Sequence, residues 1–394
     1  MANEEIQLET IPHGKLGIIG MENCSQFSGM VDHYLVKWRS TRQQLHPNDI
    51  AFKGYQRDTY LVKHKCARFG NGEAKGALYE SVRGDDIFII ADVTNHSMTY
   101  NMCGYTNHYS PDDHYQDVKR IISAIGGKAK RINVIMPFLY ESRQHRRTAR
   151  ESLDCALMLQ ELINMGVENI ITLDAHDPRV QNSIPLSGFE SVQCTYQFVK
   201  AICNNVDDLI FDNEHMMVIS PDEGGTNRAV YLANVLGINM GMFYKRRDYS
   251  KIINGHNPIV AHEYLGQDVE GKDVFIIDDM ISSGESMIDV ATELKKRKAK
   301  RIFVLTTFGL FANGLEIFDK AVESGIINNV FTTNAVYQPP ELLERDYYVS
   351  CDLSKYIAYI IDTLNHDTSL SDLLNPYDKI HSIVARYMNG EFKK

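Results

Sequence analysis

The sequence predicts an α/β protein made of two similar domains in tandem, each built on a parallel sheet with helices on both faces. The first observation is an internal repeat: residues 82–93 (VRGDDIFIIADV) and 269–280 (VEGKDVFIIDDM) agree at seven of twelve positions. Residues 127–138 and 297–308 agree again at seven of twelve. The second observation is the order of each copy, which runs from an apolar run through a helical segment and a basic turn to another apolar run. That order is typical of a βαβ unit, and runs rich in Ile, Val and Phe suit strands buried on both faces.

Composition and charge argue against several classes of protein. A chain of 394 residues is long enough for two or three domains, and 44% hydrophobic with 23% charged residues is a globular profile. The formal net charge of −10 disfavours nucleic acid or an anionic membrane surface as the main partner. No stretch approaches the ~18 continuous apolar residues of a membrane span, and the acidic N-terminus lacks the apolar core of a secretion signal. Seven cysteines without a C-x-x-C motif favour reduced thiols and a cytoplasmic location.

The remaining elements follow in chain order. Residues 1–60 look extended, including the region around Trp38, and we interpret them as a divergent extension. The paired segments start 45 residues apart in the first copy of the repeat and 28 apart in the second, and we expect a loop rich in Gly, Asn, Pro and Asp over 101–115. Further expected elements are a helix over 152–165, strands over 169–174 and 216–222, a helix over 226–237 and a C-terminal helix over 352–364.

These elements predict three parts. Residues 1–185 form the N-terminal domain, 186–340 form the second domain, and 341–394 form a helical segment that packs back on the N-terminal domain. Parallel α/β sheets bind ligands at the carboxyl ends of their strands. The polar residues directly after each apolar run are therefore the candidate ligand-binding residues.

The strongest candidate site follows the apolar run at 274–277. Asp278 and Asp279 are adjacent carboxylates, and the Ser/Gly loop 282–286 after them opens a helix. Backbone N–H groups and hydroxyls at a helix N-terminus bind a monoester phosphate well. Carboxylates accept hydrogen bonds from vicinal sugar hydroxyls or bind a cation through water. A plain strand-turn-helix with an acidic N-terminus is the simpler interpretation, but two acids and a hydroxyl-rich loop together favour function.

Three other strand ends carry polar residues. Asp174 and His176 follow the strand 169–174 and suit Mg²⁺ with polyphosphate. Residues 143–150 hold five basic side chains, counting His145, and Lys245 to Arg247 end a further strand. A solvated charge run is the usual explanation of such clusters, so their place after apolar strands is what favours a ligand.

The segment 274–287 resembles the phosphoribosyl diphosphate (PRPP) loop of type I phosphoribosyltransferases and of ribose-phosphate pyrophosphokinases. Asp174-x-His176 is similar to the metal- and ATP-binding segment of the pyrophosphokinases, which simple phosphoribosyltransferases lack. Arg143-Gln144 resembles that family's ATP-phosphate segment, and 67–90 resembles its adenine-contacting segment. The resemblance runs from about residue 60 to the C-terminus and implies two phosphoribosyltransferase-like domains.

The resemblance implies a ribose-phosphate diphosphokinase, a transferase of nucleotide biosynthesis that converts ATP and ribose 5-phosphate into PRPP and AMP. It also implies Mg²⁺ as cofactor and a homo-oligomer built from dimers, a hexamer among the forms allowed, in which a neighbouring subunit supplies the adenine-contacting loop. The residues at matching positions are Lys245 and Arg247 for catalysis, Asp278, Asp279, Ser282, Ser283, Gly284 and Ser286 for ribose 5-phosphate, Phe69, Asn71, Glu73, Arg143, Gln144 and His176 for ATP, and Asp174, His176 and Asp222 for the metal.

Several positions depart from the family pattern and leave alternatives open. The family usually has an acid where this chain has Ser282 and a glycine where it has Glu285, and His145 to Arg147 replace a mixture of acids and bases. One alternative is a PRPP-dependent phosphoribosyltransferase, which would require a nucleobase or another acceptor. Another is a non-catalytic regulatory subunit, which would bind nucleotides without turnover. A metal site in the loop 101–115 is a further interpretation, but its spacing matches no standard zinc pattern.

Overall fold

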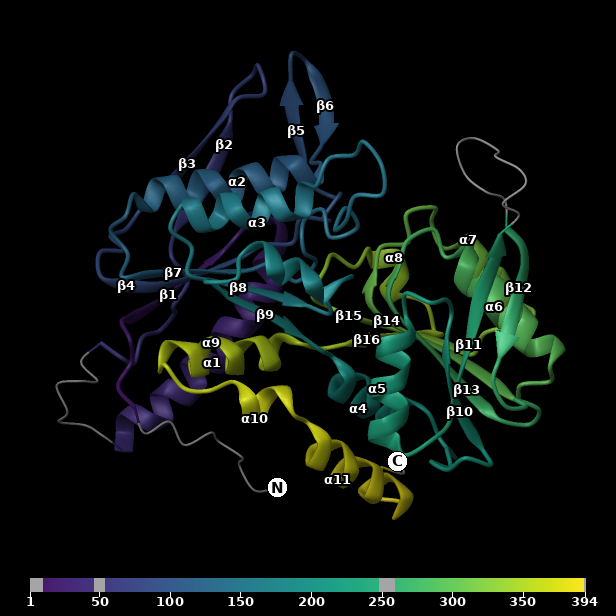
Figure 1. Ribbon diagram of the computed structural model, residues 1–394. Helices are drawn as coiled ribbons and strands as arrows, with labels where there is room; N and C mark the ends of the chain where they lie inside the picture. Colours follow the sequence, from purple (N-terminus) through teal and green to yellow (C-terminus); the bar gives the residue numbers. More distant parts are fainter. Residues whose placement is uncertain (1–9, 46–53, 248–258, 393–394) are drawn as a thin grey trace. The chain divides into compact units, whose positions relative to one another are not determined.

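The computed structural model describes residues 10–45, 54–247 and 259–392 (Figure 1). The chain forms two compact units, each with its own parallel sheet, so the predicted α/β fold class is confirmed. No helix in these three ranges combines the length and the apolarity that a bilayer crossing requires. Unit 1 comprises Met1–Gln193, Asn334–Tyr337 and Asp352–Asn375, and unit 2 comprises Cys194–Thr333, Gln338–Cys351 and Pro376–Lys394.

The boundaries differ from the predicted ones, chiefly near the C-terminus. Unit 1 extends to residue 193 because β9 (Gly188–Val192) completes its sheet by pairing with β8. Within the predicted C-terminal segment, β16 (Tyr348–Cys351) pairs in parallel with β15 and extends the sheet of unit 2. Of the residues after β16, only 352–375 belong to unit 1, whereas α11 (Tyr377–Met388) packs on α4 (Thr195–Asn205) of unit 2.

Unit 1 has three layers, with a five-stranded parallel sheet between two pairs of helices (Figure 1). Helices α2 (Pro111–Ile125) and α3 (Asp154–Asn164) cover one face, and α1 (Ser25–Leu45) and α9 (Ser354–Asn365) cover the other. The sheet order is β1-β4-β7-β8-β9, with β1 (Lys15–Gly20), β4 (Asp85–Ile90), β7 (Arg131–Ile135) and β8 (Asn169–Leu173); η1 (Glu22–Cys24), η3 (Pro178–Ser183) and α10 (Ser371–Leu374) are short helices.

The prediction of an extended segment over residues 1–60 is wrong for most of its described part. Strand β1 pairs in parallel with β4 along its whole length, and α1 is a helix of 21 residues. The helical period was present in Phe27, Val31, Leu35 and Trp38, which are all buried. The Trp38 indole stacks on Tyr359 of α9 with ring centroids 4.3 Å apart, so this face packs against a helix more than 300 residues away in sequence.

The predicted loop over 101–115 is instead part of a β-hairpin followed by the start of α2. β5 (Thr99–Met102) pairs with β6 (Tyr105–His108) across a turn in which Cys103 and Gly104 both have positive φ. Two central residues with positive φ match the twist of a tight hairpin. Ser110 accepts a hydrogen bond from the Asp113 N–H (3.1 Å) and caps α2 in a capping box, a start signal that the sequence Ser-Pro-Asp-Asp carries.

Helix α9 is held in unit 1 by a buried network of ion pairs. Asp362 accepts hydrogen bonds from Arg39 (3.0 and 2.9 Å) and Arg42 (2.6 Å) of α1. Burial alone would raise the pKa of Asp362, but the two guanidinium groups outweigh it and hold that pKa below its ordinary value. At the end of α9, Asn365 donates to Asp86 of β4 (2.8 Å). The C-terminal helix is therefore part of the core of unit 1.

Unit 2 contains a seven-stranded sheet that is parallel except at one edge. The edge strand β12 (Ile259–Leu265) runs antiparallel to β11 (Met240–Arg247) and was not predicted. The sheet order is β12-β11-β10-β13-β14-β15-β16, with β10 (Met216–Ser220), β13 (Asp273–Ile281), β14 (Arg301–Gly309) and β15 (Asn329–Thr333); the helices not yet given are α5 (Thr226–Leu236), α6 (Glu285–Lys296), α7 (Glu316–Glu323) and α8 (Pro340–Leu343).

The internal repeat extends to equivalent buried ion pairs. Arg131 on β7 makes two hydrogen bonds to Asp86 on β4 (2.9 and 2.7 Å). Arg301 on β14 makes the same two bonds to Asp273 on β13 (2.8 and 2.7 Å). In both pairs the acid and the arginine are register partners on adjacent parallel strands. The two sheets therefore have the same Asp–Arg ion pair at the start of two adjacent central strands.

Candidate functional site

The acidic residues predicted for sugar binding and one acid predicted for the metal lie at the carboxyl ends of two adjacent strands of unit 2. Strands β10 and β13 are parallel neighbours, and each is followed by a short loop and a helix. The loop after β10 carries Asp222 and leads into α5, and the end of β13 carries Asp278 and Asp279 and leads into α6. A parallel sheet thus brings together acids that are more than 50 residues apart in sequence.

Asp278 is a carboxylate held in an unfavourable electrostatic position. Its Oδ1 accepts a hydrogen bond from the Asp279 N–H (2.9 Å). Burial raises the pKa of Asp278 well above its ordinary value, and the neighbouring charges of Asp279 and Asp222 raise it further. Gly225 leaves the approach open, because a Cβ there would lie 3.3 Å from Asp278 Oδ1. A group in this position gains from hydroxyl donors or a cation, as expected of a sugar site.

Asp279 is buried and has a basic neighbour that the sequence did not indicate. Only 3% of Asp279 is exposed. The Arg228 Nη2 on α5 lies 3.8 Å from Asp279 Oδ2. Arg228 belongs to the first turn of a helix that starts after Gly224-Gly225, and only the parallel pairing of β10 with β13 brings it to the acid pair. No local spacing rule could have found this contact.

The loop 282–286 has the geometry of an anion-binding helix N-terminus. Gly284 is the N-cap of α6 with φ 87°, and a Cβ there would lie 2.4 Å from Phe318 Cε2, so only glycine fits. The Ser282 carbonyl accepts the Ala312 N–H (2.8 Å), which fixes the start of the loop. Ser282 and Ser283 are half-buried, whereas Glu285 and Ser286 are exposed. The Glu285 side chain is thus on the surface, where its charge costs least beside an anion site.

Three further predicted residues of unit 2 lie outside the pair Asp278–Asp279 and the loop 282–286. Asp222 Oδ1 accepts the N–H groups of Gly224 (2.9 Å) and Gly225 (3.3 Å), so this carboxylate also shapes the turn before α5. Lys245 and Arg247 form the last positions of β11, and their side chains lie outside the described part of the chain.

In unit 1 the strand end after β8 meets the segment after β7. Asp174 follows β8 with φ 42°, an uncommon backbone conformation for a non-glycine residue. The His176 ring lies 5.4 Å from the His145 ring, centroid to centroid. His145 Nε2 lies 3.5 Å from Asp177 Oδ2, whose pKa is lowered to about 2, chiefly by hydrogen bonds from Arg179. The structure therefore brings together His176 and the basic segment that starts at Arg143.

The two residues at the start of that basic segment differ in their surroundings. Arg143 is exposed, as expected for a side chain that contacts phosphate. The Gln144 side chain donates to the Ser152 carbonyl (2.8 Å) and thus holds its own loop closed. The predicted ATP contact of Gln144 stays a prediction.

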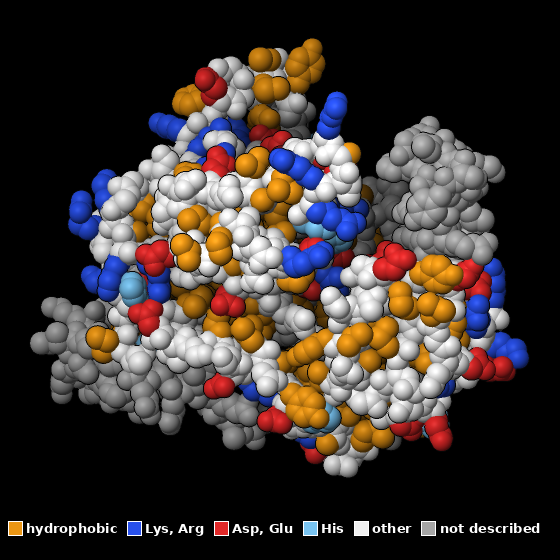
Figure 2. Space-filling model, viewed as in Figure 1, with side chains coloured by type: hydrophobic (Ala, Val, Ile, Leu, Met, Phe, Trp, Pro, Cys, Tyr) orange, Lys and Arg blue, Asp and Glu red, His pale blue; other side chains and the backbone are white. Residues whose placement is uncertain are grey.

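The three residues predicted to contact adenine lie together at the turn of the β2–β3 hairpin. The strands are β2 (His64–Arg68) and β3 (Ala74–Leu78). The Asn71 side chain donates to Glu73 Oε2 (2.6 Å), and Phe69 is 50% exposed. Figure 2 shows apolar side chains at the hairpin tips of unit 1.

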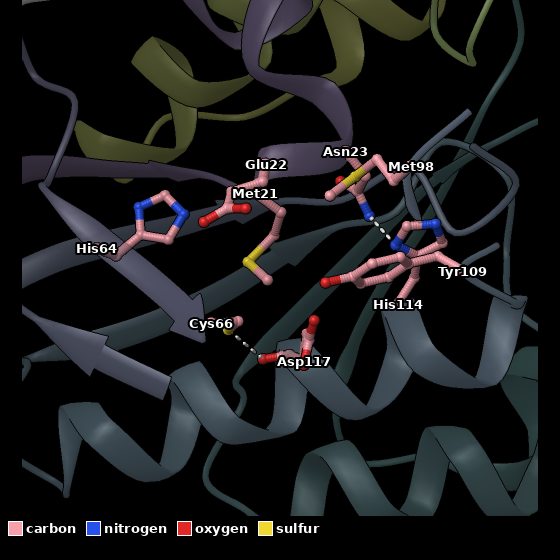
Figure 3. A pocket seen from close by; sticks show the side chains of 9 residues that line it. All are labelled: Met21, Glu22, Asn23, His64, Cys66, Met98, Tyr109, His114 and Asp117. Atoms are coloured by element: carbon pink, nitrogen blue, oxygen red, sulfur yellow. Dashed lines mark hydrogen bonds between the residues drawn. The ribbon is translucent and has the colours of Figure 1, made fainter. Parts of the chain in front are cut away.

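The described residues hold no preformed metal centre, and the cavity under the hairpins of unit 1 is small. The described ranges contain no group of three or more His, Cys, Asp or Glu side chains that could hold a metal ion, the segment 101–115 included. A cavity between β2, α2 and the segment after β1 has about 10 Å³ of free space, room for about one water (Figure 3). Its Cys66 thiol is chemically inert, because burial raises its pKa to about 12.

Comparisons with known proteins agree with this geometry. Residues 16–166 match the family model of the N-terminal domain of ribose phosphate pyrophosphokinase, and residues 191–344 match that of the phosphoribosyl transferase domain. A ribose-phosphate pyrophosphokinase of Mycoplasma genitalium is 30% identical over 281 residues, 70% of this chain and 76% of the relative. The chain belongs to the ribose-phosphate pyrophosphokinase family. A member from Vibrio cholerae is 29% identical over 315 residues, 78% of this chain and 90% of the relative.

The fold is also that of the family. The crystal structure of phosphoribosylpyrophosphate synthetase from Mycobacterium smegmatis superposes with a TM-score of 0.70 at 20% identity, covering 90% of this chain and 99% of the other. The N-terminal family model starts at residue 16, so β1 and α1 belong to the shared fold. The expectation that the resemblance begins near residue 60 is therefore wrong.

The two copies of the repeat are not equivalent as ribose-phosphate pyrophosphokinase sites. In the first copy, Ala91 and Asp92 occupy the positions of Asp278 and Asp279. Asp92 Oδ1 accepts the Thr94 N–H (2.8 Å), and Oδ2 accepts the Tyr337 N–H (2.6 Å). The acid of unit 1 therefore anchors backbone, and at these two positions only the second copy of the repeat has adjacent carboxylates.

Proposed function

We propose that this chain is a ribose-phosphate diphosphokinase, which transfers the β,γ-diphosphoryl group of ATP to the C1 hydroxyl of ribose 5-phosphate. The hydroxyl oxygen forms a bond to the β-phosphorus and loses its proton, and the bond from that phosphorus to the α,β-bridging oxygen breaks. The products are PRPP and AMP. The observation that carries the proposal is the pair Asp278 and Asp279 beside the helix N-terminus at 282–286 in unit 2.

Unit 2 binds the sugar phosphate in this proposal. Asp278 and Asp279 accept hydrogen bonds from the vicinal ribose hydroxyls, which relieves the crowding of carboxylates seen at Asp278. The backbone N–H groups and hydroxyls of Ser282, Ser283, Gly284 and Ser286 hold the 5-phosphate at the start of α6.

Unit 1 binds ATP. Phe69 stacks on adenine while Asn71 and Glu73 bond its edge, and Arg143, Gln144 and His176 contact the phosphates. Lys245 and Arg247 contribute positive charge that stabilises the transition state. Each of these roles follows from the matching position in the family.

Mg²⁺ fits the residues present in unit 1. The ion usually takes one or two protein carboxylates and completes its shell with water and substrate phosphates, so it needs no preformed three-ligand cluster. The uncommon φ of Asp174 at the end of β8 is the kind of strain that marks a functional position. Asp174 and His176 would hold the ion. Asp222 remains a separate proposed metal ligand within unit 2. When bound, Mg²⁺ supplies charge neutralisation to the polyphosphate.

The test is product formation from ATP, Mg²⁺ and ribose 5-phosphate, with AMP and PRPP followed together by chromatography. Equal amounts of AMP and PRPP are expected. Asp278→Asn should raise the KM for ribose 5-phosphate at least tenfold, about the contribution of one charged hydrogen bond. The exposed acid Asp346 provides a charge-matched control in unit 2, and Asp346→Asn should leave both KM values unchanged. ADP in place of AMP, or PRPP consumption with a nucleobase acceptor, would contradict the proposal.

We also propose a homo-oligomer in which the Phe69 loop completes the adenine site of a neighbouring subunit. The half-exposed Phe69 at the hairpin tip supports this arrangement. A chain carrying Phe69→Ala and Asn71→Ala, co-expressed with an Asp278→Asn chain, should regain activity, because some mixed sites then carry neither defect. Activity that stays at the level of the two separate variants would show that each subunit supplies its own loop.

A further inference from the structure

The β5–β6 hairpin is an addition to the first copy of the repeat. In the second copy, β13 ends at Ile281 and α6 starts at Glu285, only a few residues later. In the first copy, β4 ends at Ile90 and α2 starts at Pro111, and the intervening residues contain β5 and β6. A second hairpin has thus been placed in unit 1 where unit 2 has a bare loop (Figure 1).

The turn of this hairpin contacts the loop that carries Phe69. The Cys103 N–H donates to the Gly70 carbonyl (2.8 Å), which joins the two turns. Met102 fills the space beside Gly72, since a Cβ at Gly72 would lie 2.6 Å from Met102 Sδ. The residues in these contacts are direct neighbours of the three predicted to contact adenine.

The end of β2 next to the turn is held by α2 and by aromatic rings beside the insertion. Arg68, which precedes Phe69, makes two hydrogen bonds to Asp117 of α2 (2.7 and 3.0 Å). Its guanidinium lies 5.2 Å from the ring centroid of Tyr100 on β5 and 4.7 Å from that of Tyr109 after β6. The second hairpin thus supplies aromatic rings to the residue that anchors the first.

The space beneath both hairpins is almost completely filled. The cavity drawn in Figure 3 is lined by Cys66 of β2, by Met98 and Tyr109 on either side of the β5–β6 hairpin, and by His114 and Asp117 of α2. His114 Nδ1 accepts a hydrogen bond from the Asn23 side-chain amide (3.0 Å), and its Nε2–H donates to the Asn95 carbonyl (2.7 Å). With about 10 Å³ of free space, the side chains that line this cavity are closely packed.

We propose that the β5–β6 hairpin is a positioning element for the adenine-contacting loop, with Met102 as the positioning residue at its tip, and that it sets the affinity for the nucleotide. This inference rests on the proposed function. A two-stranded hairpin such as β2–β3 is at best marginally stable alone, so its turn would fluctuate among conformations. By contacting Gly70 and Gly72, the second hairpin orders the turn before ATP arrives and lowers the entropy lost on binding.

The experiment compares Met102→Ala with the wild type in the full chain. We expect the KM for ATP and the Kd for a non-hydrolysable ATP analogue to rise about tenfold, the effect of ordering one or two residues on binding. The kcat and the KM for ribose 5-phosphate should stay within about twofold, because no residue of the sugar site is touched. Met102→Leu, which keeps the bulk beside Gly72, should restore the affinity.

The control is Thr106→Ala, an exposed position on the same hairpin whose hydroxyl donates to Asn101. It should leave all three constants unchanged, and thermal unfolding of each variant checks that the fold is intact. An unchanged ATP affinity in Met102→Ala overturns the inference while the proposed function stands. An equal loss for both substrates overturns it too. A wild type that binds neither the ATP analogue nor ATP would instead contradict the proposed function, and this inference with it.

Discussion

At the scale of single residues, Asp278 combines a functional role with a cost in stability. Its pKa is raised in the folded state by burial and by two neighbouring acids. The folded protein therefore holds this proton more tightly than the unfolded chain does, and stability falls as the pH rises from about 4 through the folded-state pKa. Above that pKa Asp278 is charged in the folded and the unfolded state, and the full cost of burying its charge lowers the stability.

We predict that Asp278→Asn makes unit 2 more stable at pH 7 while it weakens ribose 5-phosphate binding. The melting temperature should rise by about 2–4 °C for each kcal/mol recovered, and the gain should shrink as the pH is lowered toward 4. Calorimetry at several pH values measures both trends. A gain of the same size at every pH would mean that the charge of Asp278 is not its origin.

The glycine of the phosphate loop gives a second prediction. Gly284→Ala should raise the KM for ribose 5-phosphate at least tenfold and leave the KM for ATP unchanged, because the new Cβ would meet Phe318 and displace the loop. Gly325→Ala is the matched control, since Gly325 also has positive φ (71°) but faces open space. Equal effects of the two variants on the KM would assign the loss to backbone strain alone.

The sequence predicts site residues well where those residues lie close together in the sequence. Asp278, Asp279 and the loop 282–286 follow one strand directly, and their place at a strand end was expected. Arg228 and Arg68 were not found, because each reaches its partner only through tertiary contacts between strands and helices.

At the scale of elements, the strands and helices with clear apolar runs were predicted, and the exceptions have physical reasons. Helix α1 buries only about one apolar residue per turn, and polar residues such as Asp32 and Arg39 share its buried face, so its apolar signal is weak. The β5–β6 hairpin has no alternating apolar pattern, because its side chains are mostly exposed, and it is defined by its turn and by contacts to β2–β3.

The repeated ion pairs give a prediction at this scale. Arg131→Met should destabilise its unit by about 3–5 kcal/mol, since it leaves the fully buried Asp86 unpaired. Arg301→Met should cost less, because the side chain of Arg301 is 24% exposed against 8% for Arg131. Urea unfolding followed by Trp38 fluorescence measures unit 1, and hydrogen exchange measures unit 2.

A double variant that removes Asp86 together with Arg131 tests whether the unpaired acid causes the loss of stability. Asp86→Asn combined with Arg131→Met should recover part of the loss, because no unpaired charge then remains in the core. A double variant that is less stable than Arg131→Met would show that Asp86 is held mainly by Asn133 and Asn365, which also donate to it.

At the scale of the whole molecule, neither unit is one continuous segment of the chain. The chain passes from one unit to the other after residues 193, 333, 337, 351 and 375. The full interleaving was not predicted, because α1 and α9 pair through a buried network of charged residues as well as through an apolar face, and the charged contacts have no spacing signal. The sequence did indicate that a C-terminal helix packs on the first domain.

We predict that a chain ending at residue 351 cannot form unit 1, whereas a chain ending at residue 375 can. The first lacks α9 and leaves Arg39, Arg42 and Trp38 without their partners. The second keeps α9 and loses only the part that belongs to unit 2. Fluorescence of Trp38, the single tryptophan, should be that of an exposed indole in the first chain and of a buried one in the second. Equal spectra would contradict the prediction.

The return of α9 to unit 1 has a consequence for how the protein is made. A ribosome releases the chain from its N-terminus, so β1 and α1 emerge well before Asp362 and Asn365 of α9. The aromatic face of α1 stays uncovered while the residues of β10 to β16 are added. Unit 1 waits for α9 and unit 2 waits for α11, so neither copy of the repeat could be exchanged as a self-contained cassette.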